Sequence, residues 1–301
     1  MRTELHSRNQ TVIIGPDQPF VAIGERINPT GRKKLGAQMA AGDFSAVRRD
    51  VQAQVAAGAL VLDVNAGYPM GDEVAMLVQA IREVQEAADI PLCLDSARSE
   101  ALEAALSVYS GKALVNSVTG EEERLQRVLP LVKKYGAAVI GMASDESGIS
   151  NDPQTRLAVA RKIVQRVQDY GIPREDVIID PLCLALAADP HAALVTFETM
   201  RLLRDELGVN LCCGAGNVSF GLPERAALGA AFLPIAISCG LTSAIADVTQ
   251  PAIREALLAS DLLMTRDEYA TRWLAYYREK QKAMNEASRH IPAATPDHAH
   301  V

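Results

Sequence analysis

The sequence predicts an α/β protein in which eight parallel strands alternate with about eight helices, a (β/α)8 TIM barrel. Short apolar runs recur along the chain, each too short for a helix and apolar on both faces, as in the strands of a covered parallel sheet. The stretches between these runs carry apolar residues at helical spacing. The 301 residues suffice for one such barrel of roughly 250 residues with extensions.

The predicted strands follow one another at regular intervals. They are residues 21–25, 60–65, 92–96, 113–117, 138–142, 177–181, 210–214 and 243–248. Apolar side chains at i, i+3, i+4 and i+7 within 74–81 and within 125–132 predict amphipathic helices between strands. Glycines that would close a helix just before the next strand stand at 58, 111, 136, 171, 208 and 240. A doubly wound open sheet is the alternative arrangement of the same elements.

No linker divides the chain, so we expect residues 1–287 to form one domain, with an extra C-terminal helix in 251–287. Residues 288–301 read as a flexible tail. The uncharged segment 226–246 is long enough to span a bilayer. However, Pro234, Gly240 and several hydroxyl side chains favour a helix, a turn and a strand buried in a soluble protein.

Composition narrows the class of protein. Thirty basic and thirty-seven acidic side chains give a net charge of −7, without the basic excess typical of nucleic-acid binding. The first ten residues are polar and do not resemble a signal peptide. Five cysteines in apolar surroundings, none in a CxxC pair, indicate buried thiols in a reducing compartment. We therefore expect a cytoplasmic protein.

Polar residues end most of the predicted strands. In order they are Glu25, Asp63, Asn65, Asp95, Ser96, Asn116, Ser117, Asp180, Asn217 and Asp247. In a (β/α)8 barrel the carboxyl ends of the strands meet at one mouth, where active sites lie. Any one of these residues fits a helix cap or turn equally well, but the whole set predicts a binding mouth. Its acceptors suit a neutral heterocycle rich in N–H donors, such as a pterin or purine edge. The five histidines lie off the strand ends, so the pattern predicts no metal site.

These residues stand in motifs that resemble a known family. The motifs are GERINPTG (24–31), LDVNAG (62–67), LCLDS (92–96), VNS (115–117), IDP (179–181), GAGNVSFGLP (214–223) and CGLTSAIAD (239–247). From about Phe20 to Tyr277 the chain is similar to the pterin-binding methyltransferases. Within that group it looks like the methyltetrahydrofolate:corrinoid methyltransferases and the folate module of cobalamin-dependent methionine synthase. The resemblance implies the pterin-binding, dihydropteroate-synthase-like type of barrel.

The resemblance also implies roles by position. Asp95, Asn116 and Asp180 would bind the amino-pyrimidine edge and ring N–H groups of the pterin, and Asn217 would reach N5, which carries the methyl group. Arg225 would meet the benzoyl or glutamate side of the folate. One departure is Gly216, where the family usually has serine just before this asparagine.

A corrinoid is the implied partner in methyl transfer, with cobalt(I) as the nucleophile. The chain lacks the Asp-x-His-x-x-Gly motif that usually holds a corrinoid, so we expect the corrinoid on a separate protein. Glu25, Asn28, Asp63, Asn65 and Asp247 are secondary residues of the mouth, and Glu25, Asn28 and the loop 26–42 would face the docking corrinoid protein. Simple solvation is the alternative for the basic residues of this loop, which are Arg26, Arg32, Lys33 and Lys34. The resemblance also suggests a homodimer.

The sequence thus predicts a cytoplasmic methyltransferase that moves a methyl group between N5 of tetrahydrofolate and the cobalt of a partner-bound corrinoid. Two alternatives remain. One is a dihydropteroate-synthase-like enzyme, although that family usually carries other residues where this chain has GERINPTG and NAGYPMG. The other is a pterin-binding module without catalysis, an idea that Gly216 supports.

Overall fold

Eight parallel strands form a closed barrel in the computed structural model, which describes residues 1–289. Their order around the barrel is β10-β3-β4-β5-β6-β7-β8-β9. The strands are β3 (Val21–Ile27), β4 (Val61–Asn65), β5 (Leu92–Asp95), β6 (Leu114–Val118), β7 (Ala138–Met142), β8 (Val177–Asp180), β9 (Asn210–Gly214) and β10 (Ser243–Ala246). Each predicted strand is present. Pairing of β10 with β3 closes the sheet, so the barrel is confirmed and the open sheet is wrong.

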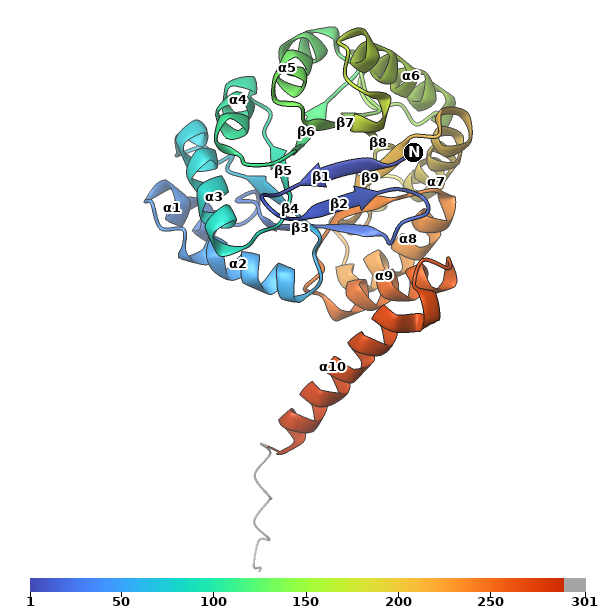
Figure 1. Cartoon of the computed structure of the whole chain (residues 1–301). Helices are drawn as coiled ribbons and strands as arrows, with labels where there is room; N and C mark the ends of the chain where they lie inside the picture. Colours follow the sequence, from blue (N-terminus) through green and yellow to red (C-terminus); the bar gives the residue numbers. More distant parts are fainter. Residues whose placement is uncertain (290–301) are drawn as a thin grey trace, which may run out of the picture.

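Helices surround the barrel (Figure 1). They are α1 (Lys33–Ala40), α2 (Ser45–Ala56), α3 (Glu73–Ala87), α4 (Ser99–Val108), α5 (Glu122–Tyr135), α6 (Pro153–Asp169), α7 (Ala192–Leu202), α8 (Arg225–Cys239) and α9 (Pro251–Leu263). The apolar segment 226–246 forms most of α8, a turn at Gly240 (φ 119°) and β10, as predicted. Within residues 1–289, no helix is long and apolar enough to cross a membrane. All five cysteines are buried and unpaired.

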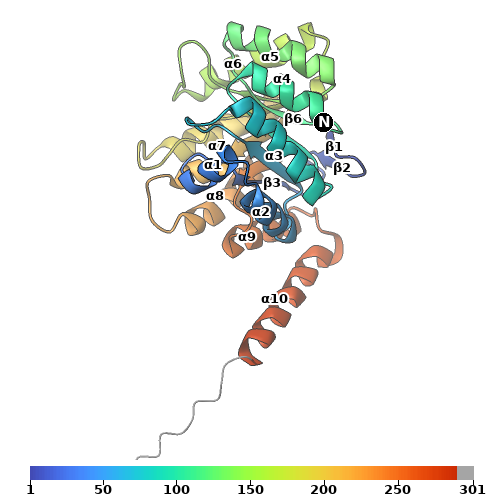
Figure 2. The ribbon, with the colours of Figure 1, turned by 90° about the vertical axis from the view of Figure 1, so that its left-hand side faces the viewer.

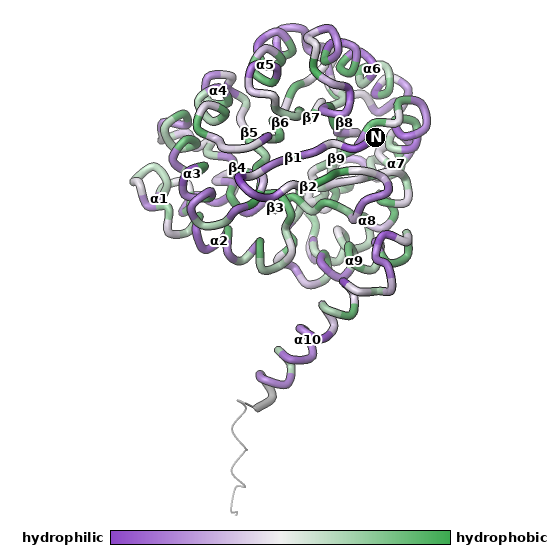
Figure 3. The backbone as a smooth tube through the Cα atoms, viewed as in Figure 1, coloured by the Kyte–Doolittle hydropathy of each residue, from purple (hydrophilic) through white to green (hydrophobic). Residues whose placement is uncertain are grey.

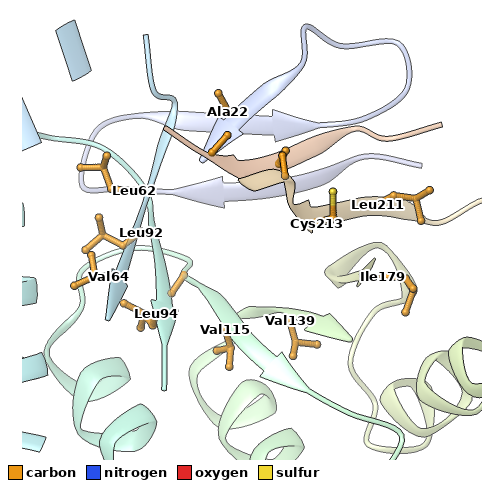
Figure 4. Packing of buried hydrophobic residues seen from close by; sticks show 14 of the residues in the cluster. Ala22, Leu62, Val64, Leu92, Leu94, Val115, Val139, Ile179, Leu211 and Cys213 are labelled. Carbon is orange, nitrogen blue, oxygen red and sulfur yellow. The ribbon is translucent and has the colours of Figure 1, made fainter. Parts of the chain in front are cut away.

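Strand alternation produces two separate apolar layers. Side chains that point outward from the barrel, such as Leu62, Leu92 and Val115, pack against the helices (Figure 4). Their neighbours along each strand point inward and fill the barrel. The inner cluster comprises Val21, Ile23, Val61, Cys93, Leu114, Ala138, Ile140, Ile178 and Cys212, together with Leu5 and Ile14 from the start of the chain. The apolar filling occupies the amino-terminal part of the barrel and leaves the carboxyl ends of the strands for polar residues.

A β-hairpin that the sequence analysis missed closes the amino-terminal end of the barrel. Strands β1 (Thr3–His6) and β2 (Thr11–Ile14) pair antiparallel and lie across the barrel (Figure 1). Leu5 and Ile14 are fully buried against the inner cluster. The buried Asn210 amide of β9 donates to Thr3 Oγ1 and to the Ile14 carbonyl, at 2.9 Å each. The first ten residues read as polar because only alternate side chains of the hairpin turn inward.

The end of the chain leaves the barrel. After α9 and the short 3-10 helix η4 (Glu268–Ala270), helix α10 (Thr271–Arg289) projects away from the body of the protein (Figures 1 and 2). Most of α10 is hydrophilic (Figure 3). The predicted tail began at residue 288, but residues 288 and 289 belong to α10, and residues 290–301 lie outside the described part of the chain.

Truncating the hairpin plug tests its contribution to stability. Leu5→Ala should lower the free energy of unfolding by about 2–5 kcal/mol, because it leaves a cavity against the inner cluster. Denaturant unfolding measures this change. The exposed neighbour Arg8→Ala is the control and should change stability by less than about 0.5 kcal/mol. Equal stability of Leu5→Ala and the wild type would mean that the plug contributes little.

Candidate functional site at the carboxyl ends of the barrel strands

The register of the strands aims the predicted site residues into the barrel. Five of them lie two positions beyond an inward-facing apolar residue of their own strand, and so point the same way. The pairs are Ile23 and Glu25, Val61 and Asp63, Cys93 and Asp95, Leu114 and Asn116, and Ile178 and Asp180. Asn65 lies opposite Asp95, and Asp95 opposite Asn116, in the parallel pairing of β4, β5 and β6. The predicted mouth is therefore present as a polar layer on top of the apolar filling.

Four of these side chains form hydrogen-bonded pairs at the mouth. Asn65 Nδ2 donates to Asp95 Oδ2 at 2.9 Å, and Asn116 Nδ2 donates to Asp63 Oδ1 at 3.3 Å. Asn65 Oδ1 also accepts from the Gly67 amide at 2.7 Å, which fixes the turn after β4. Asn65 therefore orients Asp95. Apart from the two asparagine nitrogens, which are both used in these pairs, the polar atoms of the four side chains are carboxyl and amide oxygens.

Burial changes the ionisation of the two carboxyl groups among these four side chains. It raises the pKa of Asp63 well above its usual range, and the nearby negative charge of Asp95 raises it further. Burial also raises the pKa of Asp95, against the hydrogen bond from Asn65 and the positive charge of Arg124. Asp63 is thus the carboxyl more disposed to hold a proton, and Asp95 the one more disposed to stay ionised.

Asp180 lies on the other side of the mouth, at the end of β8. Its Oδ1 accepts from the Leu182 amide at 2.7 Å. Burial raises the pKa of Asp180 to about 7, although the positive charge of Arg156 acts in the opposite direction. A group with this pKa changes its charge near neutral pH, which is common in functional sites.

Two arginines that the sequence analysis did not select hold the loops of the mouth. Arg156 of α6 is buried, and its Nη1 donates to the carbonyls of Pro181 and Leu182 at 2.8 Å each. Arg124 of α5 donates through Nη2 to the carbonyls of Ser96 and Ser117, at 2.9 and 2.7 Å. Each arginine fixes backbone at, or just beyond, the end of a strand that carries a site residue. The sequence gives one signal for Arg156: it is a charged residue among the apolar residues that form the buried face of α6.

Ser96 and Ser117 do not join the acceptors of the mouth. The Ser96 hydroxyl donates to Glu73 of α3, and its oxygen accepts from the Arg98 amide. The Ser117 hydroxyl lies 3.1 Å from the sulfur of Met142. Both hydroxyl groups therefore serve the loops around the mouth.

Asn217 lies in the 3-10 helix η3 (Ala215–Ser219), which directly follows β9. Its side chain is exposed and, within the described part of the chain, its amide has no hydrogen-bond partner. The amide lies over Gly214, where an added Cβ would stand only 2.9 Å from Asn217 Nδ2. Gly214 therefore leaves the room that lets an amide with free donors and acceptors reach the edge of the mouth.

Beside Asn217 lies a pocket of about 280 Å³, whose lining includes Glu25, Gly216, Arg225 and Asp247. Arg225, the first residue of α8, donates through Nη2 to the Gly216 carbonyl at 2.8 Å and through Nε to Ser219 Oγ at 3.3 Å. The Arg225 guanidinium also lies 5.7 Å from the ring centre of Phe220. These contacts hold a positive charge at the wall of the pocket.

Asp247 is held by its own loop. Its Oδ1 accepts from the Thr249 amide at 3.1 Å and from the Thr249 hydroxyl at 2.5 Å. Its Oδ2 accepts from Gln250 Nε2 at 3.3 Å and from Arg26 Nη1 at 3.5 Å. Asp247 is therefore a well-bonded carboxylate on the β10 side of the pocket.

The loop after β3 is held by its own hydrogen bonds and by ion pairs with α2. Asn28 Oδ1 accepts from the Thr30 amide at 2.8 Å, so Asn28 forms a turn at the rim. Arg32 pairs with Asp50 of α2 at 2.7 Å, and Arg26 Nε lies 3.9 Å from the same carboxylate. Simple solvation is thus wrong for these two arginines, while Lys33 and Lys34 are exposed.

Known proteins resemble this chain along most of its length. It is 28% identical over 268 residues to methylcorrinoid:tetrahydrofolate methyltransferase of Eubacterium limosum, a match that covers 86% of this chain and 97% of that protein. It is 29% identical over 242 residues to methionine synthase of Mycobacterium tuberculosis, covering 76% of this chain but 20% of that protein. The chain thus matches one fifth of the length of the synthase.

Solved structures of dihydropteroate synthases share the fold. The Yersinia pestis enzyme, solved with a pterine-sulfa conjugate, superimposes with a TM-score of 0.65 at 15% identity, covering 87% of this chain and 99% of that one. The Thermus thermophilus enzyme gives a TM-score of 0.64 at 22% identity, covering 86% and 99%. Residues 24–247 match the family described as pterin binding enzyme, and this range holds the carboxyl ends of all eight barrel strands. This chain belongs to the pterin binding enzyme family.

Proposed function

We propose that this protein transfers a methyl group between N5 of tetrahydrofolate and the cobalt of a corrinoid carried on a separate protein. The observation that carries the proposal is the unpartnered amide of Asn217, within the described residues, at the edge of a mouth lined with acceptors. The two relatives, one named for methyl transfer from a methylcorrinoid to tetrahydrofolate and the other a methionine synthase, support the same chemistry.

The buried acceptors fit the amino-pyrimidine edge of a pterin. That edge offers N–H groups, and carboxylate and amide oxygens accept hydrogen bonds from them. Asp95 is already oriented by Asn65, and Asp180 by the backbone of its own loop, so little ordering remains when the pterin binds. We assign Asp95, Asn116 and Asp180 to this edge, with Asp63 behind Asn116 as a buried support.

Asn217 fits the reacting end of the ring. A methyl group leaves an amine poorly unless the nitrogen gains a proton or a strong hydrogen bond as the bond breaks. A side-chain amide both donates and accepts, so Asn217 can follow N5 as its charge changes. The amide itself does not supply the proton. We assign Asn217 to stabilising the protonated N5 in the transition state.

The pocket beside Asn217 fits the rest of the folate. The benzoyl-glutamate part carries a carboxylate charge, and Arg225 presents a guanidinium held in place by Gly216 and Ser219. Phe220, on which Arg225 lies, adds an aromatic surface at the same wall. We therefore assign Arg225 to this side of the ligand.

The corrinoid is the second substrate and supplies the cobalt that accepts or donates the methyl group. We place its docking surface at the rim formed by Asn28 and the rest of the loop 26–42, next to the pocket wall that carries Glu25. The ion pairs of Arg26 and Arg32 with Asp50 hold this rim in one shape. We also propose a cytoplasmic homodimer, following the resemblance to the family.

A dihydropteroate-synthase-like reaction is less well supported. The fold is shared with those enzymes, but at 15% and 22% identity the likeness concerns the fold alone. A phosphorylated ligand would need a glycine-rich loop or clustered basic side chains. In the part of the chain that the structure describes, the lining of the pocket offers a single basic side chain, Arg225, which suits one carboxylate of a folate but is not a cluster of basic side chains.

Replacing Asn217 tests the proposed chemistry. Under anaerobic conditions, the wild type should convert free cob(I)alamin and methyltetrahydrofolate into methylcobalamin, seen as loss of the cobalt(I) absorption band. Asn217→Ala should lower the rate constant by about 10²–10³-fold, because it removes a hydrogen bond to the charge that develops on N5. The dissociation constant for methyltetrahydrofolate should rise by less than about tenfold.

Glu86→Gln, an exposed substitution on α3, is the control for Asn217→Ala and should leave both constants unchanged. Equal losses in rate and affinity would contradict the role of Asn217. Tight folate binding by the wild type, with no methyl transfer to cob(I)alamin or to a corrinoid protein, would favour the pterin-binding module.

The pKa of Asp180 predicts how folate binding depends on pH. If the carboxylate form accepts the pterin N–H groups, binding requires Asp180 to lose its proton. Because burial raises the pKa of Asp180 to about 7, affinity should fall about tenfold for each pH unit below that value. Titration calorimetry between about pH 8 and about pH 5.5 measures the slope, with Asp180→Asn as the comparison. That variant should bind more weakly at high pH and lose this part of the pH dependence; an unchanged slope would exclude Asp180 as the titrating group.

A further inference from the structure

Glu25 differs from the other carboxyl groups of the mouth. Asp63, Asp95, Asp180 and Asp247 each accept at least one hydrogen bond from a neighbouring residue. Among residues 1–289, no hydrogen bond or ion pair reaches the carboxyl of Glu25. Its oxygens nevertheless lie in a largely buried position on the wall of the pocket. A carboxyl taken out of water without a partner costs free energy, and such a cost is typical of a group kept for a ligand or a reaction.

The barrel places Glu25 close to the reacting end of the proposed ligand. Around the mouth, β9, which leads into Asn217, is followed by β10, then by β3 with Glu25, then by β4 with Asp63. Gly216, which follows β9, lies beside the side chain of Glu25 of β3. A Cβ added to Gly216 would lie 3.5 Å from Glu25 Oε2 and 3.5 Å from Arg225 Nη2. The residue before Asn217 is thus within van der Waals reach of the Glu25 carboxyl, and its missing side chain leaves the approach open.

Methyl transfer needs a proton acceptor at this place. When N5 of tetrahydrofolate is methylated, the nitrogen must lose its proton, and in the reverse direction it must regain one. Asn217 has no proton to exchange, and Asp95 and Asp180 are assigned above to the pyrimidine edge. Asp63 lies behind Asn116, to which it is hydrogen-bonded. We propose, on the basis of the methyltransferase function above, that Glu25 is the general base that takes the N5 proton, directly or through one water molecule.

The step balances in atoms and charge. The lone pair of N5 forms the new bond to the methyl carbon, and the carbon–cobalt bond breaks with its electron pair left on cobalt. The N5–H bond then breaks, its electron pair stays on nitrogen, and the proton passes to the carboxylate of Glu25. In the reverse direction the carboxylic acid of Glu25 returns this proton to N5.

The surroundings of Glu25 suit this task. Burial raises the pKa of Glu25, and the negative charge of Asp247 raises it further, while Arg225 and Arg26 act in the opposite direction. Asp63 of β4 is also close to this carboxyl, because the negative charge of Glu25 raises the pKa of Asp63. A carboxyl whose pKa lies closer to neutrality exchanges a proton more efficiently at the pH of the cell.

Chemical rescue tests the proposal. The reaction of methylcobalamin with tetrahydrofolate, in which N5 loses its proton, is followed in single turnovers for the wild type, Glu25→Ala and Glu25→Gln, with and without sodium formate at fixed ionic strength. Glu25→Ala should lose about 10²-fold in rate constant with little change in folate affinity. Added formate, a small carboxylate that fits the vacated space and can accept the N5 proton, should restore part of the rate. Glu25→Gln should be equally slow but not rescued, because the glutamine fills the space.

The outcomes separate this proposal from the proposed function. A wild-type rate in Glu25→Gln, or a loss in Glu25→Ala explained by weaker folate binding, would overturn the role of Glu25 while leaving the methyltransferase intact. Absence of methyl transfer in the wild type, with free corrinoid and with a corrinoid protein, would overturn the proposed function itself. Thermal unfolding controls for damage to the fold, and Glu25→Ala should not be less stable, because the carboxyl of Glu25 has no bonded partner to lose among the described residues.

Gly216 provides a second variant that keeps Glu25 in place. Gly216→Ser would set a hydroxyl beside the Glu25 carboxylate, and a hydrogen bond to the charged form favours that form. The pH profile of methyl transfer to cob(I)alamin, measured at saturating folate, should move to lower pH. Gly216→Ala adds the same Cβ without a hydroxyl and should keep the wild-type profile. Identical profiles for both variants would contradict the assignment of the titrating group to Glu25.

Discussion

Closure of the barrel through the pairing of β10 with β3 is the constraint on which the rest of the structure depends. In a closed parallel barrel, alternate residues of every strand must point inward, and the carboxyl ends of all strands must meet. The strand register therefore places a layer of polar side chains at the carboxyl ends of the strands, directly above the apolar side chains that fill the barrel. It also brings Asn217 and Glu25, which lie near opposite ends of the motif-bearing sequence, to the same side of the mouth.

This arrangement concentrates buried acids, which lowers stability at the site and raises reactivity. Carboxyl groups removed from water resist ionisation, and a second nearby charge adds to that resistance, as for Asp63 beside Asp95. The rest of the structure offsets the free-energy cost of burying these carboxyl groups. The mouth is held in shape before a ligand binds by the apolar layers on both sides of the strands and by the β1–β2 hairpin. The backbone contacts of Arg124 and Arg156 fix its loops. A preorganised acceptor layer then loses little freedom when a pterin binds.

Sequence reasoning could predict the barrel because its signals are local: apolar runs of strand length, helical periods, and glycines at the helix ends. The acceptors at the strand ends followed from the same pattern. The hairpin was missed because its short strands each bury only some of their side chains, and nothing in their own sequence reports the open barrel end that they cover. Arg156 and Arg124 were missed because their role depends on which loop carbonyls lie nearby. The isolation of Glu25 was equally invisible, since the absence of a partner is a property of three-dimensional structure.

The central claim is that the methyl group itself moves between N5 and cobalt within this mouth. Tracing a label tests it most directly: methyltetrahydrofolate carrying ¹³C in its N5-methyl group is incubated anaerobically with the protein and cob(I)alamin, and the products are examined by NMR. The account predicts that the labelled carbon appears bonded to cobalt, at a rate that depends on the protein. Labelled carbon that remains on N5, although the folate is bound and the cobalt(I) is intact, would contradict it.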